Sequence, residues 1–404
     1  MVTANSIRKQ VLSKLNYVED VQDCIVSECI DKEIKQYLKQ HYIPMEHWNM
    51  LKKRVFDSLR RLDILQELVE DQTITEIMVN GPEHVFIERG GHVVKADVQF
   101  ESRTKLEDVI QKIVSSSNRV VNESNPIVDS RLADGSRVNV VLQPVARNGP
   151  VLTIRKFPSS PITMERLLEI GSINKEVLEF LRGLVTAKYN IFISGGTGSG
   201  KTTFLNALSD FIPKDERVIT IEDSAELQIR EVANLVNLEA RNANVEGDNE
   251  ITIRDLIKSA LRMRPDRIIL GEVRDAAAVD LLSAMNTGHD GSLSTGHANS
   301  AKDMMYRLET LVLMGIDLPL LSVRRQIASA LDIIIHLGRL RDKTRKVLEI
   351  SEVLDCVDGE IILNPLYIFK ETSTSLEGQV QGNLQRTENV FVHTEKLKLA
   401  GVVL

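Results

Sequence analysis

The chain has 404 residues and a formal net charge of −7, and 43% of its residues are hydrophobic. This length predicts two or three domains with substantial cores, and the acidic balance argues against a protein that coats nucleic acid. Its three cysteines supply neither a disulfide framework nor a four-thiolate zinc site, and we find no secretory pattern and no apolar run of about 20 residues, so we expect a cytoplasmic protein.

The first 61 residues predict a helical segment. Apolar residues recur at helical spacing, as at Ile7, Val11 and Leu15, with few glycines and prolines between them. The segment is slightly basic, which fits either a solvated helical surface or contact with a partner or a membrane surface.

Residues 62–156 predict a small α+β domain, because short apolar strands alternate with turns such as Asn80-Gly81-Pro82 and Asp134-Gly135. Residues 157–163 contain two prolines and two serines, which is typical of a linker between domains. In residues 164–370 strands alternate with helices, and this rhythm predicts a central, mostly parallel sheet with helices on its faces. Within it, residues 346–369 predict a meander of short strands. We interpret residues 371–404 as a polar tail.

Residues 191–203 are the stretch around which the chain is organised. An apolar run reads as a buried strand, a glycine-rich loop follows, and apolar residues at helical spacing come after the loop. Strand, loop and helix form the context of a nucleoside triphosphate site with the pattern GxxxxGK[ST]. Lys201 would reach the β- and γ-phosphates, and the Thr202 hydroxyl would bind Mg²⁺. The residues predicted to hold ATP are Gly195, Gly196, Thr197, Gly198, Ser199, Gly200, Lys201, Thr202 and Thr203.

Two strands downstream end in acidic residues. Glu272 follows a buried strand, so at the carboxyl edge of a parallel sheet it would lie beside the glycine loop. There it could orient or deprotonate the attacking water, or hold Mg²⁺ through water. Glu222 ends another apolar strand and is a second candidate for Mg²⁺ or for positioning water, the alternative being an acid in a capped turn.

Two histidines flank a strand of small residues. His289 and His297 are candidates for sensing the γ-phosphate, and packing in the core is the alternative. A zinc site is disfavoured because the neighbouring sequence supplies no further thiolate or histidine ligands.

Four motifs occur in order, and together they resemble the Walker A, Asp box, Walker B and His box of the type II/type IV secretion ATPase superfamily. They occupy residues 195–203, 221–223, 261–274 and 287–300. Farther upstream, residues 76–82, 129–139 and 152–157 are similar to the N-terminal domain of the CpaF branch, the motors of tight-adherence (Tad/Flp) type IV pili. The resemblance covers residues 62–370, and the chain lacks the tetracysteine segment of other pilus ATPases, as the Tad branch does.

The resemblance implies an α/β fold, with a RecA-like P-loop domain preceded by a smaller α+β (PAS-like) domain and an N-terminal helical segment. It also implies a homohexamer that hydrolyses ATP with Mg²⁺ at the cytoplasmic face of the inner membrane, working on platform proteins of a pilus. Arginines of the small domain would reach the phosphates. Arg131, Arg137 and Arg155 match these positions, although each could instead pair with a carboxylate.

Three functions remain open at this stage. The first is the motor that assembles, and in some systems retracts, a Tad pilus. The second is the related traffic ATPase of conjugative type IV secretion. The third, from another class, is a nucleic-acid translocase, which is disfavoured because only 4% of the residues are aromatic and basic residues are not interleaved with aromatic ones.

Overall fold

The computed structural model describes residues 2–15, 21–39, 44–117, 119–157, 161–241, 249–375 and 378–403. The chain forms two compact units, residues 1–159 and residues 160–404, which we describe separately. The boundary falls within the predicted linker, of which residues 158–160 lie outside the described residues.

Unit 1 begins with three helices that bury their apolar faces against one another. The residues at helical spacing meet in one core, which includes Ile7, Val11 and Ile30, all with an exposed fraction of 0%. Burying a side chain of this size stabilises a fold by about 1.5–3 kcal/mol, so the periodicity translates directly into the helical bundle. The helices are α1 (Val2–Lys14), α2 (Asp23–Leu38) and α3 (Met45–Arg60).

The rest of unit 1 is an antiparallel sheet with its strands in the order β3-β2-β1-β6-β5-β4. Helix α5 begins at a serine cap, where the Ser102 hydroxyl accepts a hydrogen bond from the backbone of Lys105. The apolar side of α5 packs on the strands. The elements are α4 (Leu65–Glu70), β1 (Ile74–Asn80), β2 (Val85–Arg89), β3 (His92–Lys95), α5 (Arg103–Ser116), β4 (Ile127–Arg131), β5 (Arg137–Val141) and β6 (Val151–Arg155).

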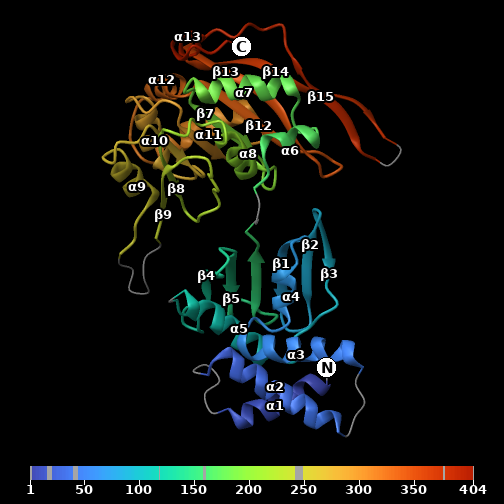
Figure 1. Cartoon of the computed structure of the whole chain (residues 1–404). Coiled ribbons are helices and arrows are strands. Elements are labelled where there is room, and N and C mark those ends of the chain that lie inside the picture. Colours follow the sequence, from blue (N-terminus) through green and yellow to red (C-terminus); the bar gives the residue numbers. More distant parts are fainter. Residues whose placement is uncertain are drawn as a thin grey trace. The chain divides into compact units, whose positions relative to one another are not determined.

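Unit 2 contains a nine-stranded sheet in the order β15-β14-β13-β12-β7-β11-β10-β8-β9 (Figure 1). Six neighbouring strands run parallel: β12, β7, β11, β10, β8 and β9. Strands β13, β14 and β15 extend the sheet beyond β12 with antiparallel pairing. The strands are β7 (Ile191–Gly195), β8 (Arg217–Glu222), β9 (Asn234–Glu239), β10 (Arg267–Leu270), β11 (Leu293–Gly296), β12 (Ile333–Arg339), β13 (Arg345–Val357), β14 (Glu360–Thr374) and β15 (Val380–Arg386).

Helices cover both faces of this sheet, as the alternating pattern predicted. One face carries α6 (Met164–Glu169), α7 (Lys175–Thr186), α8 (Lys201–Ser209) and α13 (Glu395–Ala400). The other face carries α9 (Ile253–Ala260), α10 (Ala277–Met285), α11 (Ala301–Leu313) and α12 (Leu320–Ala330). The α/β fold is therefore confirmed, with β7 at the centre and buried along its whole length, as a continuous apolar run in a parallel sheet requires.

The structure differs from the sequence interpretation in the last third of unit 2. Residues 346–369, expected as short strands, form most of two long strands of 13 and 15 residues. The segment treated as a tail from residue 371 continues the sheet through β14 and β15 and then packs Leu397 of α13 into the core. Its polar composition misled the prediction, because a strand pairs through its backbone whatever its exposed side chains are.

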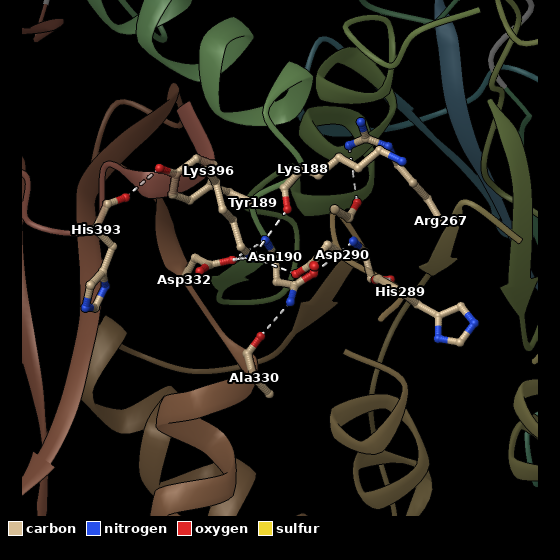
Figure 2. A network of polar contacts seen from close by, with 12 residues as sticks. Lys188, Tyr189, Asn190, Arg267, His289, Asp290, Ala330, Asp332, His393 and Lys396 are labelled. Atoms are coloured by element: carbon tan, nitrogen blue, oxygen red, sulfur yellow. Dashed lines mark hydrogen bonds and ion pairs between the residues drawn. The ribbon is translucent and has the colours of Figure 1, made fainter. Parts of the chain in front are cut away.

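A polar network joins the starts of β7, β11 and β12, at the edge opposite their carboxyl ends (Figure 2). The Asn190 side chain donates to the carbonyl of Ala330 and accepts from the backbone of Ser292. Lys396 of α13 contacts Asp290 and Asp332. The C-terminal helix is thereby tied to the three central strands.

Candidate nucleotide-binding site

The loop between β7 and α8 has a shape that only glycine allows. Gly198 and Gly200 have φ values of 71° and 94°, in the left-handed region that side chains disfavour. A Cβ atom on Gly195 would lie 2.5 Å from both the Ser199 Oγ and the Leu337 carbonyl, so a side chain cannot be placed there without displacing the loop. Around Gly196 and Gly198 no described atom beyond each glycine and its two chain neighbours lies within 4 Å of such a position.

The loop leads directly into the first turn of α8, for which Gly200 is the N-terminal cap. Backbone N–H groups in a first helical turn have no partner within the helix, and the helix dipole adds partial positive charge there. Lys201, Thr202 and Thr203 occupy this turn. The arrangement is an anion site suited to the phosphates of a nucleotide.

The Lys201 ammonium is buried and faces three acceptors. It donates to the carbonyls of Gly195 and Gly196, each at 3.1 Å, and lies 3.2 Å from Nδ1 of His297. Only 7% of the residue is exposed. Neutral carbonyls are weaker partners for an ammonium than phosphate oxygens are, so this lysine can exchange them for a phosphate.

Glu272 and His297 lie at neighbouring strand ends and join Lys201 in one chain of contacts. Strand order explains this, because β11 lies between β7 and β10 and all three run parallel. His297 Nε2 lies 3.1 Å from Oε1 of Glu272. The structure thus brings Glu272 and His297 together with Lys201, and their predicted roles in catalysis and γ-phosphate sensing stay predictions.

The protonation states of this pair follow from their surroundings. Burial lowers the pKa of His297, and the charge of Lys201 lowers it further. The imidazole is then neutral near pH 7, with Nε2–H donated to Glu272 and Nδ1 accepting from Lys201. Burial raises the pKa of Glu272, but Arg274, His297 and Lys201 outweigh that effect and leave the pKa below its usual value. Glu272 is accordingly a carboxylate.

Glu222 lies in a different environment at the end of β8. Its Oε1 accepts hydrogen bonds from the backbone of Glu226 at 2.8 Å and Leu227 at 2.9 Å, and only 5% of the residue is exposed. Burial raises its pKa to about 7, although the two backbone contacts act in the opposite direction. In this arrangement the side chain holds the turn after β8, and its predicted role toward Mg²⁺ or water stays a prediction.

His289 does not belong to this site. It precedes β11, whereas His297 follows it, so the two rings lie at opposite edges of the sheet. Nδ1 of His289 lies 3.3 Å from the Ala284 carbonyl, within the region of the polar network (Figure 2). The expectation that both histidines sense the γ-phosphate is wrong for His289, because a strand separates residues that are close in sequence.

Mg²⁺ fits this site as a companion of the nucleotide. Thr202, the predicted ligand, is half-buried in the first turn of α8. Within the part of the chain that the structure describes, no group of three or more histidine, cysteine, aspartate or glutamate residues could hold a metal ion. Mg²⁺ commonly binds through one or two protein oxygens together with substrate phosphates, and that requirement agrees with a hydroxyl beside an anion site.

The comparisons with known proteins agree with this geometry. The profile of the family "Type II/IV secretion system protein" matches residues 59–393. The chain belongs to this family. It is 36% identical to a putative conjugal transfer protein of Mycobacterium tuberculosis over 74% of its length and 86% of that protein. It is 32% identical to the type IV secretion system protein VirB11 of Bartonella henselae over 72% of its length and 92% of that protein.

A solved structure shows the same fold at lower identity. The ATPase DotB of Legionella pneumophila has a TM-score of 0.50 and 23% identity, with 70% of this chain and 78% of that chain covered. The superfamily suggested by the four motifs is thus confirmed. These two relatives bear a conjugal-transfer name and a type IV secretion name.

The three candidate arginines of this secretion-family chain stand in one row on unit 1. Arg131 on β4 pairs directly with Arg137 on β5, and Arg137 pairs with Arg155 on β6. Directly paired residues share a face of the sheet, with Cβ atoms about 4.5–5.5 Å apart. The row lies on the face opposite α5 and continues on β1 with Glu76, which pairs directly with Arg155, so the carboxylate neighbour expected as the alternative is present for this arginine. The role of the row toward the nucleotide stays a prediction.

Sequence reasoning missed three residues around the glycine loop. Arg274 donates to Oε2 of Glu272 at 2.8 Å and lies 3.4 Å from Asp223. Arg345 donates from Nε to the Gly198 carbonyl at 2.8 Å. His336 contacts the strand beneath the loop. Arg274 stands two residues after Glu272 and could have been found, but Arg345 and His336 lie more than 130 residues from the loop and carry no local signal.

No helix among the described residues is both long and apolar enough to cross a bilayer.

Proposed function

We propose that this chain binds ATP with Mg²⁺ at the glycine loop and hydrolyses it to drive a secretion machine of the conjugative type IV kind. The observation that carries the proposal is the chain of contacts from Lys201 through His297 to Glu272, next to a loop shaped for phosphates. It combines an anion site, a cation and an ionised carboxylate at one sheet edge.

Each of these groups has a distinct task. The amides of the first turn of α8 and the Lys201 ammonium hold the phosphates, and Thr202 would bind Mg²⁺, which neutralises phosphate charge when bound. The Glu272 carboxylate accepts a hydrogen bond from the attacking water. Because its pKa is lowered, it is a weak base, so it contributes mainly by orienting the water.

His297 is placed to sense the γ-phosphate. Its Nδ1 contacts the lysine that must move toward the phosphates, and its Nε2 contacts the carboxylate that orients water. When a phosphate occupies the site and Lys201 moves toward it, the contacts of the His297 ring with Lys201 and with Glu272 both change. This arrangement couples nucleotide binding to the position of the catalytic carboxylate.

The arginine row of unit 1 supplies the charge that the transition state still needs. Arginine suits this task because its planar group donates two parallel hydrogen bonds and remains protonated. We infer that Arg131, Arg137 and Arg155 serve the nucleotide site of a homohexameric ring. The ring would act on inner-membrane proteins at the cytoplasmic face, with no direct contact to nucleic acid.

Two machines remain to be distinguished. The names of the relatives support conjugative type IV secretion, whereas the Tad pilus reading rests on motifs in residues 76–157. The two functions can be separated in a strain that lacks this chain, by measuring both the growth of pili and the transfer of a plasmid. Loss of transfer with intact pili supports the conjugative function.

The hydrolytic site is tested by two variants of the full-length chain. Lys201→Ala should abolish binding of a fluorescent ATP analogue. Glu272→Gln should retain binding while phosphate release falls by about 10²–10⁴-fold, the range for losing a positioned acid–base group. Glu388→Gln, an exposed acid after β15, is the matched control and should leave turnover unchanged. Turnover of the Glu272 variant within threefold of wild type would contradict the assignment.

A further inference from the structure

His336 is a buried histidine beneath the glycine loop that the proposed chemistry does not use. It lies on β12, the strand next to β7, and pairs directly with Ser194, the residue before Gly195. Exposure is 6% for His336 and 0% for Ser194. Both side chains face the side of the sheet covered by α11, since Phe192 and Ile334, two residues earlier on each strand, belong to that core.

The ring links two segments that come from distant parts of the sequence. Nδ1 of His336 lies 2.9 Å from the Ser194 hydroxyl, at the end of the strand that carries the glycine loop. Ser194 also pairs across the sheet with Gly296, the residue before His297, and the backbone of Asn299, two residues after His297, faces the ring as an acceptor that raises the pKa of His336. Asn299 belongs to the turn before α11, whose cap is Ser300. One side chain therefore bridges the base of the loop and the turn that holds His297.

The charges around the ring favour its neutral form. Burial lowers the pKa of His336, and the nearby ammonium of Lys201 acts in the same direction. Glu349, Asp303 and the backbone of Asn299 act in the opposite direction without outweighing burial. A neutral imidazole has one donor and one acceptor. Both are used when the ring donates to the Asn299 carbonyl and accepts from the Ser194 hydroxyl.

We propose that His336 is a positioning residue that fixes the 297–300 turn against β7, so that His297 stays within reach of Lys201 and Glu272. It acts through Asn299 and Ser194 and does not touch the nucleotide. The inference rests on the proposed ATP hydrolysis at this site. Misplacing a group by about 1 Å can slow a reaction by roughly 10²-fold, so loss of the bridge lowers kcat while the loop still binds nucleotide.

The test uses full-length protein with three substitutions. His336→Leu removes both hydrogen bonds at similar volume, His336→Gln retains a donor and an acceptor, and His289→Gln changes the histidine at the opposite edge of the sheet. We expect the leucine variant to lose about 10–100-fold in kcat. Its affinity for fluorescent ADP should stay within about threefold of wild type, since the loop and Lys201 are intact. The glutamine variant should recover most of kcat, and His289→Gln should match wild type.

Ser194→Ala gives a milder test in case the leucine variant does not fold. It removes only the hydroxyl partner, so kcat should fall less than in His336→Leu. In the double variant with His336→Gln, the fold-loss in kcat should be smaller than the product of the losses in the two single variants. Equal losses of kcat, affinity and melting temperature in the leucine and glutamine variants would show a packing role and overturn the proposal. Wild-type-like kcat in His336→Leu would overturn it as well. A wild-type protein that binds ATP but releases no phosphate would instead refute the proposed hydrolysis.

Discussion

Replacing Lys396 by methionine should destabilise unit 2 selectively. Lys396 of α13 lies 2.7 Å from Oδ1 of Asp290 and 2.7 Å from Oδ2 of Asp332 (Figure 2). Asp332 stands at the start of β12, and the backbone of Asn190, at the start of β7, also donates to it. The methionine keeps the apolar part of the side chain and removes the charge that both carboxylates face.

The two contacts differ in value because their surroundings differ. The Asp290 side chain is 48% exposed, so its ion pair contributes only about 0.2–1 kcal/mol. The Asp332 side chain is 19% exposed, and a hydrogen bond between charged groups in such a place contributes about 1.5–3 kcal/mol. The sum is about 2–4 kcal/mol, which for a unit of this size corresponds to a fall in melting temperature of roughly 4–16 °C.

The single tryptophan makes the measurement selective for one unit. Trp48 lies in α3 of unit 1 and packs against the core of the helical bundle. Its fluorescence therefore follows unfolding of unit 1, whereas circular dichroism follows both units. We expect the transition of unit 2 to shift in circular dichroism while the fluorescence transition stays in place. Lys398→Met, on the exposed side of the same helix, is the matched control and should shift neither.

The effect should depend on pH in a defined direction. Burial raises the pKa of Asp332 above its usual value, and Lys396 opposes this. When folding raises the pKa of a carboxyl group, the stability of the fold decreases as pH rises from the pKa of the unfolded state to the pKa of the folded state. Without Lys396 the pKa rises further, so the destabilisation should be larger at pH 8 than at pH 5. Equal shifts for Lys396→Met and Lys398→Met, or a larger effect at pH 5, would refute the reasoning.

Three further predictions concern the site and the assembly. Glu222→Gln should keep both backbone contacts. Because burial raises the pKa of Glu222 to about 7, the variant should be more stable than wild type, and the difference should be larger at pH 8 than at pH 6. A fall in turnover beyond tenfold would instead support the role of Glu222 toward Mg²⁺ or water. Replacing Arg131, Arg137 and Arg155 together by alanine should leave nucleotide affinity within about tenfold and lower turnover by about 10³-fold, while Arg103→Ala, on the surface of α5, should change neither. Light scattering with an ATP analogue should give a mass near six chains, and a strict monomer under all nucleotide conditions would contradict the ring.

Much of the nucleotide site could be predicted because its signals are local. The glycines and Lys201 lie within a few residues of each other, and a turn that requires positive φ can be recognised from its own sequence. Glu272 was found by a general property of parallel sheets, whose strands all end at one edge. Neither inference depends on which strands are neighbours.

The roles of the histidines and of Glu222 depended on information that the sequence lacks. His297 meets Lys201 because β11 lies beside β7, and strand order is set by packing of the whole sheet. His289 was misassigned since four strand residues are enough to carry it to the opposite edge. For Glu222, the backbone of the following turn satisfies the carboxylate, a contact that only the path of the chain after β8 reveals.

The P-loop, the alternation of strands and helices and the helical segment can all be recognised in the amino-acid sequence, because hydrophobic periodicity and turn chemistry act over short distances. Three other features depend on how the whole chain packs: the row of arginines across three strands, the contact of His336 with Ser194 and the attachment of α13 by Lys396. Each of these joins residues from separate strands or helices. Such contacts form when buried polar groups find partners during packing, and this choice depends on every neighbouring element at once.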